Sequence, residues 1–241
     1  MRKYFCLLLV ILAFHGTGLS QITDNLPADL PRTFSLVFNQ GFMLSGSQPD
    51  SVPVSGAGSG STFIGAGVRI PLGENIVGIR LTPGAKWTTI SYLQNNLKTF
   101  PTINDSLEFT PSQEKHSLFL GSLEGGFYFN ISRDEDHDPK FFVEAGGYVD
   151  YLFSASLKTK FTNAEGLRVK EKVRDLAQLD GEFNRFQYGI YGRVGYKWAS
   201  LYLNYRLVEI FDDFSQRAGA PEGYRNPPMP PLQIGLSIFF L

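Results

Sequence analysis

The sequence predicts an all-β protein, an eight-stranded antiparallel up-and-down transmembrane β-barrel with long extracellular loops and short periplasmic turns. Three observations predict this fold. Apolar and polar side chains alternate along residues 186–211 in two runs that meet at a tight turn, 197–200. The same alternation, which places one type of side chain on each face of a strand, recurs through the chain. The connections between these runs alternate between short and long, as they do in membrane barrels.

Residues 1–20 are predicted to be a signal peptide. Two basic residues precede the apolar run 5–14, and small residues stand just before Gln21, where we expect cleavage. The apolar run is shorter than the roughly 20 residues that a membrane-spanning helix needs. We expect a short periplasmic leader over 21–32 and the barrel domain over 33–241.

Eight alternating runs are predicted as strands. Their approximate bounds are 33–44, 61–72, 76–92, 116–130, 140–158, the two arms of 186–211, and 232–241. Pro83 has no N–H for a strand ladder, so we expect a β-bulge at that position. The connection 159–184 has irregularly spaced apolar residues, which fit a hairpin extension and a short amphipathic helix equally well.

The composition excludes several classes of protein. The chain has 21 Phe, 11 Tyr and 25 Gly, only 19% of its residues are charged, and its formal net charge is −1. Aromatic residues are favoured in strands, and the near-neutral net charge gives no support for binding of nucleic acid. Cys6 is the only cysteine and lies inside the predicted signal peptide. The mature chain is therefore expected to form no disulfide, thiolate metal site or lipid anchor.

The polar face of the strands is expected to line the interior of the barrel. It is rich in Gly and Ser, which suits the narrow interior of eight strands. Large aromatic residues near strand ends, such as Trp87, Tyr151, Tyr196 and Trp198, fit the aromatic girdles of a membrane barrel better than a soluble barrel.

Charged residues on this face are predicted to form a network of ion pairs, because an unpaired buried charge is costly. The predicted members are Arg69, Arg80, Lys86, Glu124, Glu144, Asp150, Arg193, Lys197 and Arg206. A narrow path for ions or protons is the functional alternative, and structural packing of the interior is favoured over it.

The chemistry of an enzyme or a metal site is not apparent in the sequence, and no cofactor is expected. The acidic turn 134–138 contains His137, but Pro139 stands where a calcium loop needs glycine. A small membrane hydrolase would need a histidine beside a nucleophile, and His116 is the candidate. Its neighbour Ser117 would face the opposite side of a strand. The chain is therefore not expected to be an enzyme.

Residues 141–155, with the sequence FFVEAGGYVDYLFSA, resemble the central strand of the PorT-like outer-membrane β-barrel proteins, which are common in the Bacteroidetes. The family pattern there is close to FYLEAGPYVGYLLSA, so Gly147 stands where proline is frequent and Asp150 where glycine is frequent. Further similar stretches are 188–196, 201–205 and 233–236. The resemblance implies an outer-membrane location and an eight-stranded barrel. Its namesake members are associated with gliding and type IX secretion, a role that the resemblance alone does not transfer.

The function expected from these features is a non-catalytic structural or binding scaffold in the outer membrane. Recognition would lie in the extracellular loops, because loops on a rigid frame commonly carry binding. The alternatives are an accessory component of a secretion or gliding machinery, a narrow channel or transport component, and, less favoured, a small outer-membrane enzyme. The expected partners are outer-membrane lipid and proteins of the envelope or the cell surface, not nucleic acid.

Overall fold

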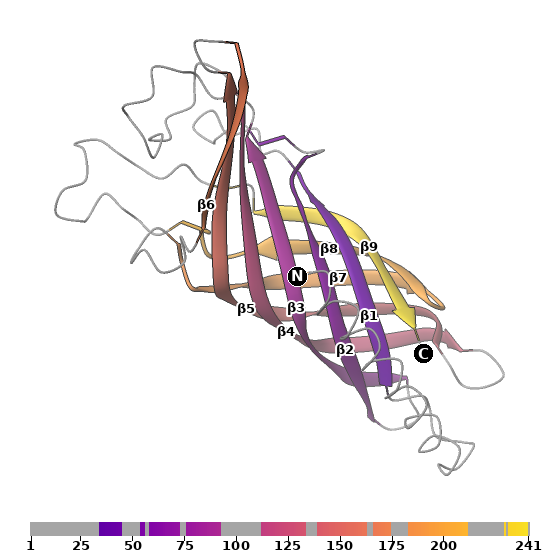
Figure 1. The fold of residues 1–241 in the computed structure, drawn as a ribbon. Helices are drawn as coiled ribbons and strands as arrows, with labels where there is room; N and C mark the ends of the chain where they lie inside the picture. Colours follow the sequence, from indigo (N-terminus) through magenta and orange to yellow (C-terminus); the bar gives the residue numbers. More distant parts are fainter. Residues whose placement is uncertain are drawn as a thin grey trace, which may run out of the picture.

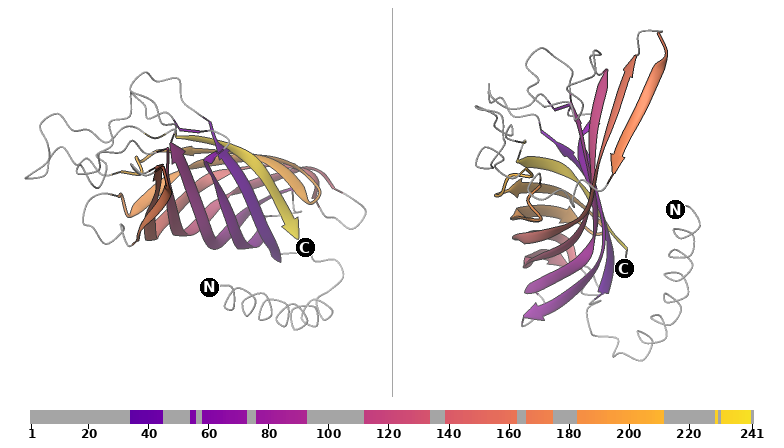
Figure 2. Two further views of the ribbon diagram at one scale, coloured as in Figure 1. Left: turned by 45° about the horizontal axis from the view of Figure 1, so that its top comes forward. Right: turned by 60° about the vertical axis from the view of Figure 1, so that its left-hand side comes forward.

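A computed structural model shows one antiparallel sheet that curls into a closed barrel, with one additional strand at its outer side (Figures 1 and 2). The structure describes residues 34–44, 54–55, 58–72, 76–92, 112–133, 139–162, 166–174, 183–211, 229 and 231–240. The predicted signal peptide and leader lie outside these residues. Within the described part of the chain, no helix is long and apolar enough to cross a membrane.

Nine strands make up the sheet. They are β1 (Phe34–Met43), β2 (Gly60–Leu72), β3 (Val77–Tyr92), β4 (Gln113–Arg133), β5 (Pro139–Thr162), β6 (Arg168–Arg174), β7 (Phe186–Tyr196), β8 (Ala199–Arg206) and β9 (Leu232–Phe240). Their order is β4-β3-β2-β1-β9-β8-β7-β5-β6, and β4 also pairs with β5. That last pairing closes a ring of eight strands and leaves β6 outside the ring. The predicted eight-stranded antiparallel barrel is confirmed.

The two ends of the barrel differ. Leu36 of β1 pairs with Phe240 of β9, so the first and last strands meet near the two ends of the described chain. The strand ends that the short connections join, between β2 and β3, β4 and β5, and β7 and β8, are at this same end. The opposite end of the strands, where the longer connections begin and finish, is called the outer end.

The additional strand β6 belongs to a hairpin at the outer end. β5 pairs with β7 over 141–151 and then, along the same edge, with β6 over 156–162. Gly166 in the connection between β5 and β6 has a φ of 78°, a left-handed conformation that glycine adopts without strain. Of the two forms that the sequence allowed for 159–184, the described residues take the hairpin. Figure 2 shows this hairpin projecting beyond the barrel.

The β-bulge predicted at Pro83 does not form. The pairs Gly65–Gly84 and Val68–Leu81 lie in one register, so no residue is inserted between them. The β2–β3 ladder skips Pro83 because proline has no N–H to donate, and the strand continues with Pro83 opposite Leu123 of β4.

A register shift occurs instead in β5. Phe119 pairs with Ser154 and Leu120 pairs with Leu152, so Phe153 is the extra residue. Beyond it, the faces of β5 exchange: Ala155 is fully buried, whereas Ser154, expected inside from simple alternation, is exposed. An inserted residue has this effect because side chains alternate with a period of two.

Side-chain packing inside the barrel depends on glycine. A Cβ atom built on Gly195 would lie 2.3 Å from the ring of Phe142, and one built on Gly41 would lie 2.0 Å from the hydroxyl of Tyr202. Large inward-facing rings therefore occupy the space above glycine on neighbouring strands. This arrangement fills the interior of a barrel that is only eight strands wide.

Candidate functional site

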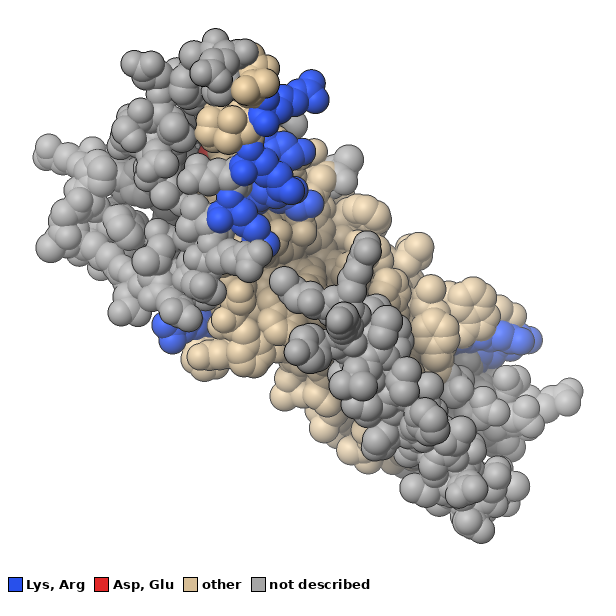
Figure 3. Space-filling model, in the orientation of Figure 1, with Lys and Arg blue, Asp and Glu red and all other residues tan. Residues whose placement is uncertain are grey.

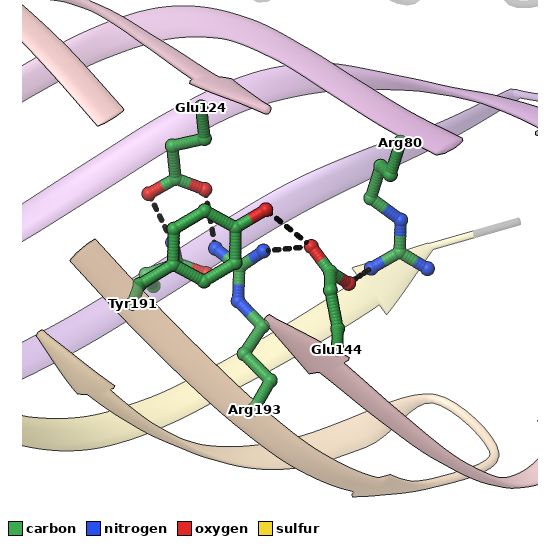
Figure 4. A network of polar contacts seen from close by, with 6 residues as sticks. Arg80, Glu124, Glu144, Tyr191 and Arg193 are labelled. Carbon is green, nitrogen blue, oxygen red and sulfur yellow. Dashed lines mark hydrogen bonds and ion pairs between the residues drawn. The ribbon is translucent and has the colours of Figure 1, made fainter. Parts of the chain in front are cut away.

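A chain of alternating charges crosses the middle of the barrel (Figure 4). Arg193 lies between two carboxylates: its Nη2 donates to Glu124, and its Nη1 donates to Glu144 at 2.8 Å. The second carboxylate oxygen of Glu144 accepts from Arg80 at 2.5 Å, and Tyr191 donates its hydroxyl to Glu144 at 2.7 Å. All five side chains are buried. Two guanidinium groups thus compensate two carboxylates away from bulk water.

The sheet aligns these side chains. Arg193 and Glu144 are directly paired residues of β7 and β5, so their side chains leave the same face opposite each other. Arg80 lies on β3, two strands from Glu144, and pairs with Gly126 of the intervening β4. A Cβ atom on Gly126 would lie 2.7 Å from the hydroxyl of Tyr191. Glycine at this position therefore keeps the space in which the ion pairs pass over β4.

A second ion pair lies beside this network. Lys86 Nζ donates to Asp150 at 2.7 Å, and its ammonium lies 4.5 Å from the centroid of the Tyr148 ring. Asn39 on β1 reaches Glu124, with its Nδ2 3.5 Å from Oε1. A cation held by both a carboxylate and an aromatic face is well stabilised in a buried place.

Sequence reasoning did not assign the tyrosines to the network. Tyr191 is two residues from Arg193, and Tyr148 is two residues from Asp150. Residues two apart on a strand share a face, so the alternation does place both tyrosines on the polar face, although only charged residues were predicted as members of the network.

Two more of the predicted cations are inside the barrel, and one is not. Arg69 and Arg206 are buried, and Arg206 Nη2 donates to the carbonyl oxygen of Met229 at 3.1 Å. Lys197 is exposed in the turn after β7, with a φ of 49°. Its assignment to the interior was wrong, because the alternation was continued one residue past Tyr196, where the turn redirects the side chain.

Apolar side chains cover the charges on both sides. Toward the chain ends, one buried cluster consists of Val37, Phe63, Phe142 and Phe239. The guanidinium of Arg80 lies 4.5 Å from the ring centroid of Phe239, so this cluster adjoins the charges directly. Toward the outer end, a larger cluster consists of Met43, Val54, Ile90, Tyr92, Leu118, Leu120, Leu152, Ala155, Leu157, Phe183, Ile210, Phe211 and Met229. An ion entering the barrel would meet apolar packing before it reached the charges.

His116 lies against this outer apolar cluster. Its Nδ1 is 2.8 Å from the hydroxyl of Tyr92. Its ring meets the rings of Phe183 and Phe211 edge-on, with centroids 5.7 Å apart in both cases. These contacts pack the histidine as part of the apolar closure.

The neighbouring serine does not join His116. Ser117 is exposed on the opposite face of β4, so the two side chains do not form a nucleophile–base pair. His137 and the acidic turn 134–138 lie outside the described residues. Across the residues that the structure describes, no group of three His, Cys, Asp or Glu side chains could hold a metal ion.

Comparison with protein families identifies the architecture. The family model for the outer membrane protein beta-barrel domain matches residues 20–212, which include every strand from β1 to β8. The chain belongs to this family. The match also confirms the predicted location of this barrel in the outer membrane.

Two solved structures are similar to this outer-membrane barrel at low sequence identity. Ail, the attachment invasion locus protein of Yersinia pestis, is 10% identical, with 86% of this chain and 93% of Ail covered and a TM-score of 0.29. A major outer membrane protein from Thermus thermophilus is 13% identical, with 86% of this chain and 99% of that protein covered and a TM-score of 0.34. A comparison with curated proteins gave no significant match. The family match alone carries the assignment.

The outward face of the barrel suits this location. Val149, Ile190 and Leu236 expose 45%, 54% and 58% of their surface around the ring, which is the behaviour of side chains that face lipid. Trp87 faces outward toward the outer end, and Trp198 faces outward in the turn at the opposite end. Aromatic side chains therefore border the apolar belt at both ends, as in membrane barrels.

Proposed function

We propose that this outer-membrane barrel is a non-catalytic scaffold that holds a recognition surface above the membrane. The observation that carries the proposal is the hairpin β5–β6. β5 has 24 residues, whereas about 9–11 residues of a tilted strand cross a bilayer. Seven of the remaining residues pair with β6 beyond the part of β5 that pairs with β7. Strand pairing makes this projection a firmer support for binding than a single loop.

The interior of the barrel supports a scaffold rather than a channel. The ion pairs of Arg193, Glu124, Glu144 and Arg80 bridge four strands, and apolar clusters lie on both sides of them. Eight strands leave room for side chains and not for an aqueous path. Transport through the barrel would require both clusters to rearrange.

A shortened hairpin tests the scaffold function. Lys160 and Lys170 are paired, so joining them through an Asn-Gly turn would remove the outer part of the hairpin and keep the residues of β5 that pair with β4, including Leu157 of the outer apolar cluster. We expect this variant to reach the outer membrane and to keep the different gel migration of folded and boiled protein. Cross-linking to surface partners on intact cells should be lost.

Three results would contradict the proposed scaffold function. Failure of the shortened variant to fold would mean that the hairpin is part of the barrel's own structure. An unchanged cross-linking pattern would place recognition elsewhere. Stable, large currents from the full-length barrel in a planar bilayer would favour the channel instead.

A second candidate function follows from the resemblance of residues 141–155 to PorT-like proteins. It would make the barrel an accessory component of a secretion or gliding machinery. Purification from native membranes in mild detergent distinguishes the two candidates. A stable complex of fixed stoichiometry with components of that machinery supports the accessory role. A barrel that purifies alone and shows hairpin-dependent cross-links on intact cells supports the scaffold.

A further inference from the structure

Basic side chains line the outer surface of the β5–β6 hairpin and the adjoining end of β4. We call this set the basic ladder, and its members are Lys115, Lys158, Lys160, Arg168, Lys170 and Lys172. Figure 3 shows Lys and Arg gathered over the outer ends of β5 and β6. Ladder residues stand next to buried residues such as Leu157 and Phe161 along the strand. Because neighbouring side chains point to opposite faces, the members of the ladder share the outward face.

The strand register places these charges opposite one another. Lys158 of β5 pairs with Lys115 of β4 on one side and with Lys172 of β6 on the other. One pair further out, Lys160 faces Lys170. Like charges directly opposite on a sheet are destabilising. The repulsion is visible in one group: the ammonium of Lys170 lowers the pKa of Lys158 below its ordinary value.

The described carboxylate nearest in the sheet, Glu114, is buried on the other face of β4 and so does not lie among the ladder residues. Among the described residues, the ion pairs of the barrel interior include no member of the ladder. A row of exposed cations on one face of a sheet attracts an anionic partner.

A row of aromatic rings fixes the height of the ladder above the membrane. Its members, in contact from strand to strand with centroids 5.0–5.9 Å apart, are Trp87, Phe119, Phe153, Tyr151 and Phe186. They come from β3, β4, β5 and β7 and face outward. Such a row marks the boundary between lipid chains and headgroups.

The ladder begins a short distance beyond this row. Lys115 is four residues from Phe119 along β4, and Lys158 is five residues from Phe153 along β5. At about 3.3 Å per residue and a tilt of about 40°, these separations are roughly 10–13 Å along the membrane normal. The headgroup layer is roughly 5–8 Å thick, and a lysine side chain can lean back toward it. The ammonium groups of Lys115 and Lys158, the ladder residues nearest to the aromatic row, can therefore reach the layer of lipid headgroups.

We propose that the basic ladder binds the phosphate groups of the lipid headgroups in the outer leaflet around the barrel. The lipid source is favoured over a soluble polyanion because the ladder continues the same outward face that carries the aromatic row. A soluble anion would have no need of that continuity. In an outer membrane the matching chemistry is that of a phosphorylated glucosamine lipid.

The test compares two double variants of the full mature barrel in neutral detergent. Lys158→Gln with Lys170→Gln removes two charges from the ladder. Lys140→Gln with Lys197→Gln removes two exposed lysines at the opposite end of the barrel and is the matched control. Native mass spectrometry then measures binding of bis-phosphorylated lipid A, of the same lipid after removal of its phosphates, and of inorganic phosphate.

The ladder variant should bind bis-phosphorylated lipid A roughly 25-fold more weakly, about fivefold for each charge, while the control stays within about twofold of the native barrel. The native preference over dephosphorylated lipid should fall with added salt. The same gel migration of folded protein in all three barrels checks that the variants fold. Binding of inorganic phosphate alone should be weak.

Three outcomes would overturn the proposal. Equal loss of binding in the ladder and control variants would show a general charge effect. Equal binding of phosphorylated and dephosphorylated lipid would exclude the phosphates. Strong, ladder-dependent binding of a soluble sulfated polysaccharide, with no preference for phosphorylated lipid, would make a soluble polyanion the partner instead.

Discussion

Removal of Arg193 should destabilise the barrel more than removal of a cation at the surface. Arg193 contacts both Glu124 and Glu144 and so joins the two carboxylates of the network. In Arg193→Met, Glu144 keeps Arg80 and Tyr191, whereas Glu124 is left with the contact to Asn39 at 3.5 Å. Breaking a buried ion pair from one side costs about 3–5 kcal/mol. Because a whole domain is stable by only about 5–15 kcal/mol, the loss should be easily measured.

Urea unfolding of the barrel in lipid vesicles, followed by fluorescence of its two tryptophans, gives the free energy of unfolding. The control is Lys140→Met, which removes an exposed cation and should change this free energy by about 0.5 kcal/mol or less. Adding Glu124→Gln to Arg193→Met removes the stranded charge and should recover about 1–3 kcal/mol.

Two results would refute this reasoning. A loss below about 1 kcal/mol in Arg193→Met would mean that water solvates the carboxylates inside the barrel. A double variant that is less stable than Arg193→Met would show that Glu124 is stabilised by groups other than Arg193. In either case the network would not act as a coupled unit.

Three further predictions test the faces and the packing of the barrel. An arginine at Val149 or Ile190 should cost about 2–4 kcal/mol of stability in vesicles, whereas a loss near zero would remove these positions from the lipid-facing belt. A polarity-sensitive dye on a single cysteine at Ser154 should report the membrane interface, whereas one at Ala155 should report the packed interior of the barrel. The opposite pattern would contradict the bulge at Phe153. Gly126→Val should destabilise the barrel by about 1–3 kcal/mol in the same urea titration, because a Cβ atom there would lie 2.5 Å from the carbonyl oxygen of Ala145 and 2.7 Å from the hydroxyl of Tyr191. An unchanged midpoint would show that the interior has spare room.

The period-two pattern predicted the strands and most of their faces because the pleat itself fixes that period. It failed where the pleat is interrupted. Beyond Phe153 an inserted residue exchanges the faces of β5, and the sequence around it fits either register. At Lys197 the pattern was carried past the end of the strand into a turn.

Partners across the barrel could not be predicted residue by residue. The charges were recognised as a set, but alternation does not say which strand faces which. Arg80 and Glu144 lie two strands apart and meet only because the sheet curves and Gly126 leaves room between them. For the connection 159–184 the apolar spacing fitted two forms, and the choice of a hairpin depends on the free edge that β5 offers beyond β7.

The ion pairs of the network do not cross the seam between β1 and β9, where the first and last strands of the barrel meet. The four charged members of the network come from β3, β4, β5 and β7, which are consecutive neighbours around the ring. At the seam, by contrast, Gly41 pairs with Gly235, and Asn39 pairs with Ser237. Parting β1 from β9 would break backbone hydrogen bonds without separating any of these ion pairs. An open sheet can therefore carry its charges already neutralised and join its first and last strands as the final step of assembly.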